Sequence, residues 1–537
     1  MDIKDFDIWY IYSSYFDKEN INLQKIAKNF IELDCAQIVL DLDRNIYWKN
    51  EKEKVKIDKI KAIGNFENYT LEFPEDLKEK QHIEFAYQGA QMIINSQNLL
   101  NDYLYDFCNY IRIYCAPYYL HNSDNDFTVS LYPQIKIFEN GIVQIIFRKI
   151  GPDENISIDN FVNDYINLYK HYFSEIWIPR GFITIDSFIN GEYGNKIKLF
   201  PKKQINLLNK ISEIYKNKSV KSSDDFEFEI VKLPFEKDNI DKMTFNFDFI
   251  INQIFDVISY CINVNIQKPL KFSNEYILDG NWKGIESVYL IDFDDQPTKS
   301  ENIKKETKKE LSKIMYKTTS DLKENKIDLG EDLRIFNDYN LFVNHSQLLW
   351  SLSKQGKINK IDPNRGDIIY DKQVLSEMIS FRHALHKRIN DQASSENYTI
   401  LEIINNRIKL NNFDQIFSLK LSSYGEIKEL MQVIEEKMQI DKLKFFTDKN
   451  FKIKKDKANE IKENRNQLIA IILTIVAVFF SISSLAQGLV KPIYIHYMKV
   501  EKGNLLGEVI IPHSIVLLFF ILIFIMVVLI LKKSPRG

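Results

Sequence analysis

The 537-residue sequence lacks the local motifs by which most enzyme and nucleotide-binding families are recognised. It contains no Walker A loop, no Rossmann glycine fingerprint, no HExxH zinc motif and no G-x-S-x-G nucleophile elbow. Its 71 basic and 74 acidic side chains nearly cancel, so no global basic field suggests nucleic-acid binding. We therefore expect no enzyme and no direct nucleic-acid partner. A membrane-anchored cytosolic enzyme with faint motifs stays an open alternative.

Cysteine is scarce as well, and no two cysteines form a CxxC pair. Apolar or aromatic residues surround all four, which predicts buried thiols of a reducing compartment. The N-terminal sequence MDIKDFDIWY lacks the basic and apolar regions of a signal peptide. The N-terminal body is therefore expected in the cytosol. The four cysteines are Cys35, Cys108, Cys115 and Cys261.

Long apolar runs are present only near the C-terminus. Residues 468–485 read LIAIILTIVAVFFSISSL, and residues 515–531 read IVLLFFILIFIMVVLIL. Each approaches the ~20 residues that an α-helix needs to cross a hydrocarbon layer of ~30 Å. The sequence thus predicts a transmembrane hairpin. Its parts are a first span over 467–490, an outer loop over 491–509 and a second span over 510–531.

Basic residues lie mainly on one side of the predicted hairpin. Nine lysines and arginines between 442 and 465 precede the first span, and a basic tail over 532–537 follows the second. The loop between the spans holds only Lys491, Lys499 and Lys502. Because excess Lys and Arg marks the cytosolic side, both termini are expected inside. The prediction is a multi-pass protein of the cell's inner (plasma) membrane.

The part before the membrane mixes strand and helix patterns. IKIFENGIVQIIF predicts a hairpin at Asn140-Gly141, the preferred type I′ pair, and Ser157 is the expected N-cap of the next helix. Near His345 and Ser346, a strand end is expected to run into a capped helix start. The predicted fold class is an α/β cytosolic domain with a helical stalk and a C-terminal two-helix transmembrane hairpin. The expected regions are an α/β sensor region over 1–330 with a seam near 216–229, a mainly helical region over 331–440, and a stalk over 441–466.

Small and polar residues recur along the first span at steps of three and four, which places them on one helix face. Two interpretations stay open for this face. It could let helices pack closely, or it could line a pore formed by several copies around an axis. The pore-lining candidates are Asn466, Ala470, Thr474, Ala477, Ser481, Ser484 and Gly488.

This layout resembles the CorA family of divalent-cation channels and transporters. The local similarity is ENRNQLIAIILTIVAVFFS, in which Asn464 and Arg465 stand just before the apolar run. The resemblance implies a homo-oligomer, specifically a pentamer, and Mg²⁺ as the one candidate cofactor or transported ion. It also implies the first alternative function, constitutive transport of Mg²⁺ or another divalent cation.

The sequence departs from the family where the outer loop usually begins with Gly-Met-Asn. Residues 486–490 read AQGLV instead, and the cytosolic body is larger than simple Mg²⁺ uptake requires. In these respects the chain is similar to CorA-like proteins that are encoded with type III CRISPR systems. That similarity implies an antiviral effector, a nucleotide second messenger of the S-adenosylmethionine–AMP type as trigger, and membrane disruption as outcome. Our expected function is therefore a channel or pore gated by a ligand on the cytosolic body.

Two polar groups in the body are candidate sites. Arg382, His386 and Arg388 lie near one helical face and could bind an anion, although a solvated basic helix is the simpler interpretation. Closely spaced carboxylates after a strand could bind Mg²⁺ through oxygen, or they could form an ordinary polar turn. These metal candidates are Asp292, Asp294 and Asp295.

Overall fold

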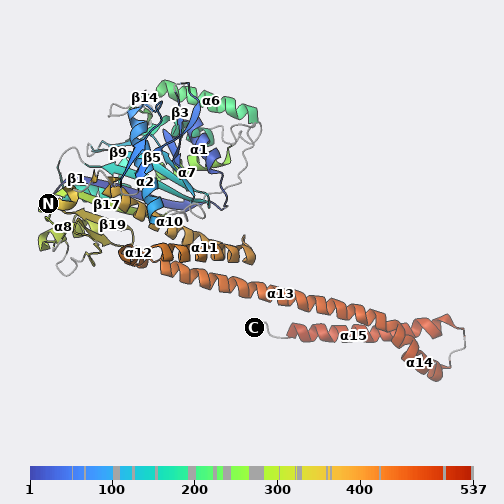
Figure 1. The fold of residues 1–537 in the computed structure, drawn as a ribbon. Coiled ribbons are helices and arrows are strands. Elements are labelled where there is room, and N and C mark those ends of the chain that lie inside the picture. The colour runs from blue at the N-terminus through green and yellow to red at the C-terminus, as the bar shows by residue number, and fades with distance from the viewer. Residues whose placement is uncertain are drawn as a thin grey trace. The chain divides into compact units, whose positions relative to one another are not determined.

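The protein is described here from a computed structural model, in which the chain divides into two compact units, Met1–Asp448 and Lys449–Gly537 (Figure 1). The structure describes all residues except 18, 51, 66–67, 101–108, 124–126, 152–154, 191–200, 222–226, 234–243, 265–282, 301–302, 321, 323–328, 335, 359–360, 363–365, 422–424, 500–502 and 534–537. Cys108 lies outside the described residues, whereas the other three cysteines are free, buried thiols.

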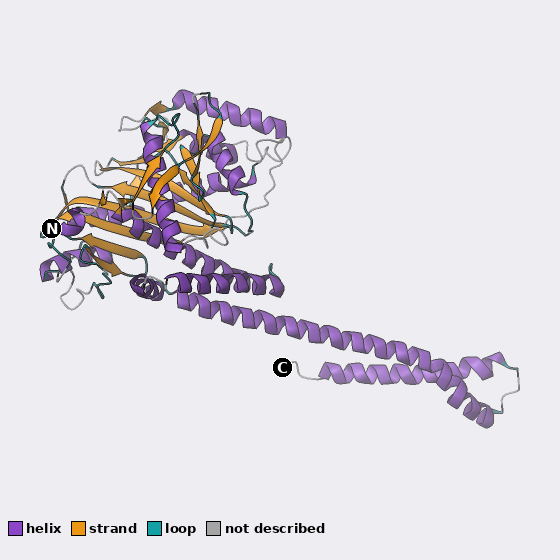
Figure 2. Cartoon of the chain, in the orientation of Figure 1, coloured by secondary structure: helices purple, strands orange, loops and turns teal. Residues whose placement is uncertain are grey.

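A large sheet organises the first unit, with helices packed against it (Figure 2). Its main path runs β14-β15-β13-β8-β9-β10-β1-β17-β19-β18, and β17 pairs with β19 in parallel while β1 pairs with β10 and β17 antiparallel. The strands of this path are β1 (Asp2–Tyr15), β8 (Tyr118–Asn122), β9 (Phe127–Phe138), β10 (Ile142–Ile150), β13 (Glu175–Pro179), β14 (Val220–Lys221), β15 (Glu229–Leu233), β17 (Lys283–Phe293), β18 (Tyr339–Val343) and β19 (Gln347–Leu352).

The sheet branches at strand β9. The first half of β9 pairs with β8, and the second half pairs with β7 (Tyr110–Tyr114). Pro133 lies between the two halves, and its carbonyl accepts a hydrogen bond from the Cys115 amide at 3.1 Å. The second branch continues from β7 to β2 (Ile38–Asp41), β3 (Asn45–Lys49) and β4 (Val55–Lys59). Shorter strands are β5 (Lys61–Asn65), β6 (Asn68–Glu72), β11 (Ile156–Ser157), β12 (Tyr172–Phe173), β16 (Phe245–Asn246), β20 (Ile361–Asp362) and β21 (Gly366–Asp367).

Alternation along β1 supplies one apolar core on each face of the sheet, because successive strand side chains point to opposite faces. Ile8 and Tyr10 belong to one buried cluster, and Trp9 and Ile11 belong to the other. The first cluster includes residues of α1 (Leu23–Glu32), α5 (Arg180–Asn190), α7 (Phe247–Asn263) and α8 (Lys305–Tyr316). The second includes residues of α2 (Lys80–Leu100), α10 (Ile368–Ser394), α11 (Ile400–Leu421) and α12 (Gly425–Lys437).

Among the remaining helical segments, α13, α15 and α6 are long and the others are short. α13 (Ile440–Leu485) begins in the first unit and continues into the second, where α15 (Ile511–Lys533) is the other long apolar helix. Between them lie the π-helix η5 (Ala486–Val490), α14 (Lys491–Met498) and the π-helix η6 (Leu506–Ile510). The first unit also contains α4 (Ile158–Asn160), η1 (Phe161–Ile166), η2 (Leu168–Lys170), α6 (Pro201–Lys218) and α9 (Lys354–Ile358).

The strongest local predictions are confirmed in outline and corrected in one detail. β9 and β10 form the expected hairpin, and the Ser157 side chain caps α4 by accepting a hydrogen bond from the Asn160 amide at 3.3 Å. The type I′ turn is wrong, because that turn requires positive φ at both central residues. The Gly141 amide donates to the Phe138 carbonyl at 2.9 Å, and only Gly141, at φ 93°, reaches the left-handed region after the turn.

The prediction of a helix start near Ser346 is wrong. Asn344, His345 and Ser346 connect β18 to β19, and the Asn344 side chain accepts a hydrogen bond from the Ser346 amide at 2.9 Å. β19 then joins the central sheet beside β17. The apolar run Leu348–Leu352 fits a buried strand or a helix equally well by pattern, and its pairing with the distant β17 decides for the strand.

One helix among the described residues is long and apolar enough to cross a membrane. This helical run covers Ile440–Met498, and the apolar window within it is not buried in the protein. The described part of the second apolar run, Leu506–Leu522, is shorter than a full span. The chain is thus a mixed α/β protein with a large sheet and one long apolar helix towards its C-terminus.

Candidate ligand-binding site

The larger of two cavities among the described residues lies between helix α2 and the face of the sheet formed by β7, β9 and β10. Its volume is about 1030 Å³, ample for a ligand of several hundred daltons. The N-terminal turn of α10 closes another side through Tyr370. Aromatic rings dominate the apolar part of the lining. They belong to Phe73, Phe85, Tyr87, Tyr114, Tyr132 and Tyr370.

A stack of rings forms one wall of this cavity. Phe85 of α2 stacks on Tyr114 of β7, with ring centroids 5.3 Å apart and planes at 18°. The helix can approach the strand this closely because residue 89 is glycine. A Cβ atom there would lie 2.8 Å from Leu40 and 3.0 Å from the Tyr114 ring. The wall therefore depends on close contact between α2 and the sheet.

Two polar groups in the lining have unused hydrogen-bonding capacity. Gln88 accepts a hydrogen bond from the Gln134 side chain at 3.4 Å through Oε1. Within the described part of the chain, no partner faces Gln88 Nε2 or the Tyr114 hydroxyl, although both atoms are buried. Burial raises the pKa of Tyr114, so its hydroxyl stays protonated and can donate. An unmade buried hydrogen bond costs about 1–3 kcal/mol, which a ligand with acceptor atoms would recover.

Positive charge reaches the cavity from β10 and α2. Arg148 is held by Asp7, whose Oδ2 lies 2.7 Å from Nη2, and its guanidinium lies over the Trp9 ring at 4.8 Å. Lys80 of α2 also lines the cavity, and its ammonium lies 4.0 Å from the Glu84 carboxylate. The lining therefore combines aromatic surface, buried donors and the guanidinium of Arg148, which suits a ligand with an aromatic group and electron-rich parts.

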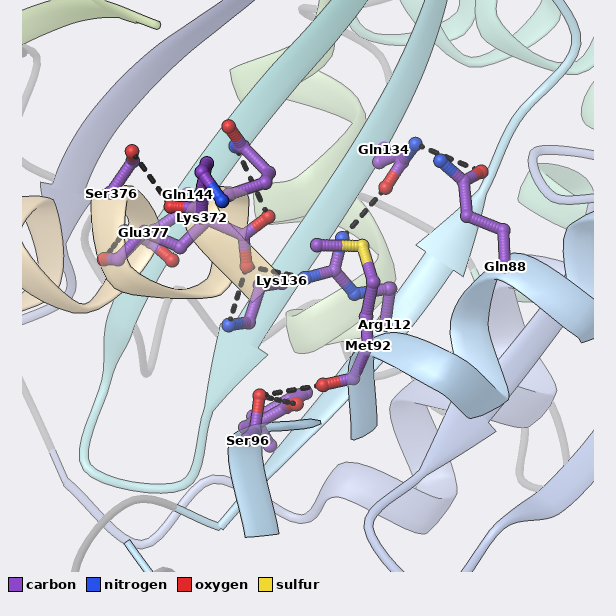
Figure 3. A network of polar contacts seen from close by, with 12 residues as sticks. Gln88, Met92, Ser96, Arg112, Gln134, Lys136, Gln144, Lys372, Ser376 and Glu377 are labelled. Carbon is purple, nitrogen blue, oxygen red and sulfur yellow. Dashed lines mark hydrogen bonds and ion pairs between the residues drawn. The ribbon is translucent and has the colours of Figure 1, made fainter. Parts of the chain in front are cut away.

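A buried ion cluster lies behind the cavity wall and joins it to α10 (Figure 3). Gln134 accepts a hydrogen bond from Arg112 at 2.7 Å, and Arg112 forms an ion pair with Glu377 of α10. Lys136 donates to the same carboxylate at 2.9 Å. Burial alone would raise the pKa of Glu377, but the adjacent Arg112 and Lys136 charges outweigh it and lower the pKa, so the carboxylate is ionised. The cavity and α10 are thus connected through Gln134.

Further along α10, two of the predicted ligand residues belong to a second buried cluster, which we call the helix joint. Arg382 forms ion pairs with Asp414 of α11, at 2.8 Å, and with Glu435 of α12. His386 Nε2 lies 3.3 Å from Asp414, and Lys444 of α13 lies 3.8 Å from it. Arg382 and His386 are therefore brought together as predicted, but their partners are carboxylates of neighbouring helices, and neither residue lines the large cavity.

Arg388, the third predicted ligand residue, lines a separate and smaller cavity of about 470 Å³. Its guanidinium donates to the Asn140 and Asp17 carbonyls and lies 3.7 Å from Glu19. Glu19 in turn contacts Lys409 at 2.7 Å. The structure thus separates Arg388 from the other two candidates and occupies it with protein partners.

The three candidate metal ligands do not converge. Asp292 pairs with Lys357, Asp294 pairs with Lys4 at 2.8 Å, and Asp295 lies 3.7 Å from Lys304. Among the described residues no group of three or more His, Cys, Asp or Glu side chains could hold a metal ion. Three lysine pairs in place of a shared centre favour the interpretation of a polar turn.

The small and polar face of the first predicted span is exposed in the single chain. Thr474 and Ser481 each donate their hydroxyl to the carbonyl four residues earlier, at 2.8 Å. A Cβ atom on Gly488 would meet nothing within 4 Å. The other candidates on this face, Asn466, Ala470, Ala477 and Ser484, are exposed as well. Within the described part of the chain, these side chains are therefore not covered by other residues.

Sequence reasoning missed Gln88, Tyr114, Arg148 and Glu377. The sequence signal that could have pointed to this site is a polar residue within a mostly apolar strand. Gln134 and Lys136 are examples, because they alternate with buried isoleucines in β9. Comparison of the chain with protein-family models, curated proteins and solved structures finds no match.

Proposed function

We propose that the chain forms a homo-oligomeric, CorA-like membrane pore that opens when a small ligand binds in the large cavity of the cytosolic body. In this proposal α13 and α15 cross the inner membrane as a hairpin, with both termini in the cytosol. The ligand class that fits the resemblance is a nucleotide second messenger of the S-adenosylmethionine–AMP type. The outcome would be membrane disruption in antiviral defence, with a pentamer as the assembly that the resemblance implies.

The observation that carries the proposal is the course of α13. This single helix starts at Ile440 in the first unit and ends at Leu485, the last residue of the apolar run. A continuous helix that begins in the body and crosses a membrane can transmit a movement of its first turns. A passive anchor would not need this continuity.

The contacts around α10 supply a route from the cavity to α13. Gln134 links the cavity to Arg112, and Arg112 links to Glu377. Arg382, five residues later on α10, pairs with α11 and α12 in the helix joint, and Lys444 connects the joint to α13. A ligand shifts the equilibrium between the closed and open states of the pore only as far as its affinities for these two states differ. Moving it from 1:99 to 99:1 takes about 5.5 kcal/mol.

The cavity lining supports a ligand with a planar aromatic part. Stacking of a base on an aromatic side chain is worth about 1–3 kcal/mol, and lysine or arginine at the rim favours phosphate. The small and polar face with Thr474 and Ser481 is less apolar than the rest of the span, which favours contact with water or protein over contact with lipid. One hairpin cannot enclose such a path, so several copies are required.

The experiment that tests the proposed site measures binding to the full-length protein in detergent by titration calorimetry. The probes are the S-adenosylmethionine–AMP conjugate, S-adenosylmethionine, AMP and ATP. Gln88→Ala should weaken binding of the preferred probe at least tenfold, whereas Glu19→Gln at the smaller cavity should not change it. If no probe binds, or if only Glu19→Gln weakens binding, the large cavity is not the site.

Two alternatives predict different behaviour. A constitutive Mg²⁺ transporter would conduct without any nucleotide and close as cytosolic Mg²⁺ rises. A membrane-anchored enzyme would retain an activity when the chain is truncated before Arg465. The carboxylates Asp292, Asp294 and Asp295 each pair with a lysine, so these three residues do not add support to the transporter.

A further inference from the structure

The segment between the two apolar helices carries an exposed apolar stripe. Leu489, Ile493 and Tyr497 follow one another at intervals of four residues, which places them on one side of a helix. Their side chains are 58%, 53% and 79% exposed. Leu485, four residues before Leu489, is exposed too, so the stripe continues from the end of α13 into α14. Such a surface would be unfavourable if the segment projected into water.

This segment is folded onto the ends of both apolar helices. α14 contacts η5 and η6, and α15 contacts both of these π-helices. Lys491 at the start of α14 lies 3.3 Å from Glu508 of η6, and the Gly503 amide donates to the same carboxylate at 3.1 Å. α14 is therefore held beside the points where the two apolar helices begin and end.

The lengths of the apolar runs set the depth of α14 in a membrane. Residues 468–485 and 515–531 span about 27 Å and about 26 Å at roughly 1.5 Å per residue, close to the hydrocarbon thickness of ~30 Å. η5 and η6, which follow the first run and precede the second, then lie at the same far interface. α14, only about 12 Å long, cannot leave that level while it contacts both.

We propose that α14 and the end of η5 lie in the lipid interface of the leaflet opposite the cytosolic side, with Leu489, Ile493 and Tyr497 inserted between the lipids. The proposal rests on the membrane insertion put forward under the proposed function. Its partner is the bilayer surface, because the stripe is continuous with the end of the membrane-crossing helix and ends in a tyrosine. Tyrosine prefers the headgroup level, where its ring is shielded and its hydroxyl is wet. The Lys491–Glu508 pair removes two charges from this interface.

The test uses the full-length chain in phosphatidylcholine–phosphatidylglycerol liposomes, with Cys108→Ser in every variant. A polarity-sensitive fluorophore is attached at Tyr497→Cys, at Leu473→Cys as the deep control, and at Glu460→Cys as the aqueous control. Quenching is measured with lipids that carry the quencher near the headgroup or deep in the acyl chain, and with aqueous iodide. The expected result is that position 497 is quenched most by the shallow lipid, position 473 by the deep lipid, and position 460 by iodide.

Two results would overturn the inference while leaving membrane insertion intact. Position 497 could be quenched by iodide alone, which would mean that α14 projects into water. It could also be shielded from every quencher, which would mean that another copy of the chain covers the stripe. If position 473 is not reached by the deep lipid quencher, the proposed membrane insertion itself fails.

Discussion

Replacing Glu377 by glutamine should destabilise the first unit by about 3–5 kcal/mol, the usual cost of breaking a buried ion pair by removing one partner. Glu377 and Arg112 are fully buried, and the Lys136 side chain is 5% exposed. At an effective dielectric constant of about 20, two unit charges 2.9 Å apart attract by roughly 6 kcal/mol, so the carboxylate is a large local stabiliser of the two cations. Glutamine keeps the shape but leaves both cations without a counter-charge.

The number of residues in the first unit determines how far this loss of stability lowers the midpoint temperature of unfolding. With an unfolding entropy of about 2.1 cal/mol/K per residue, its 448 residues give roughly 0.9 kcal/mol/K, so the midpoint should fall by about 3–5 °C. The measurement is differential scanning calorimetry of the full chain in detergent. The matched control is Glu227→Gln, which breaks the surface pair with Lys221, both 68% exposed, and should leave the midpoint unchanged.

An unchanged midpoint in Glu377→Gln would refute the account of this cluster as a stabilising link between the sheet and α10. A complementary variant sharpens the test. Replacing Glu377, Arg112 and Lys136 together by leucine or methionine removes all three charges, and apolar replacements of buried ion clusters are often neutral or stabilising. The triple variant should therefore recover most of the lost stability but lose the polar connection between the cavity and α10.

Three further predictions concern the cavity, the helix joint and the pore face. Tyr114→Phe should leave the unfolding midpoint unchanged or higher, because the Tyr114 hydroxyl has no partner in the described structure. The same variant should weaken ligand binding measured by calorimetry. A lower unfolding midpoint would contradict the absence of a partner for this hydroxyl. Burial lowers the pKa of His386, so the unfolded chain binds a proton at this histidine more readily than the folded chain does. The free energy of unfolding should therefore fall as the pH drops below the ordinary histidine pKa near 6.5. The fall should be smaller in His386→Gln. Thr474→Leu and Ser481→Leu should each reduce ligand-induced ion flux severalfold, whereas Leu473→Ile should not; equal flux in all three variants would favour helix packing.

The features that the sequence predicts well are those fixed by neighbouring residues. The β9–β10 hairpin and the Ser157 cap depend on a few adjacent side chains, and both are found. The helix expected near Ser346 fails for the opposite reason. The strand that replaces it is stabilised by pairing with β17, about 60 residues earlier in the chain, and local pattern carries no information on that partner.

The cavity could not be predicted because its walls come from distant parts of the chain. The Gln88–Gln134 contact joins residues 46 apart, and the Arg112–Glu377 pair joins residues 265 apart. The sequence did single out Arg382 and His386 as unusual in a helix. It could not show that Asp414 contacts both residues and that Glu435 pairs with Arg382, since these carboxylates lie on two later helices. Polar residues that alternate in a strand normally indicate a solvated face, and here α2 and α10 cover it.

Ligand-dependent ion release from liposomes that contain only the full-length chain tests the central claim most directly. The liposomes hold an ion-sensitive dye, and the S-adenosylmethionine–AMP conjugate, S-adenosylmethionine, AMP and ATP are added to the side that exposes the body. The account predicts that one of these nucleotides triggers rapid release and that Gln88→Ala raises the concentration required. Vesicles that stay tight with every nucleotide, or that leak equally without any, would contradict it.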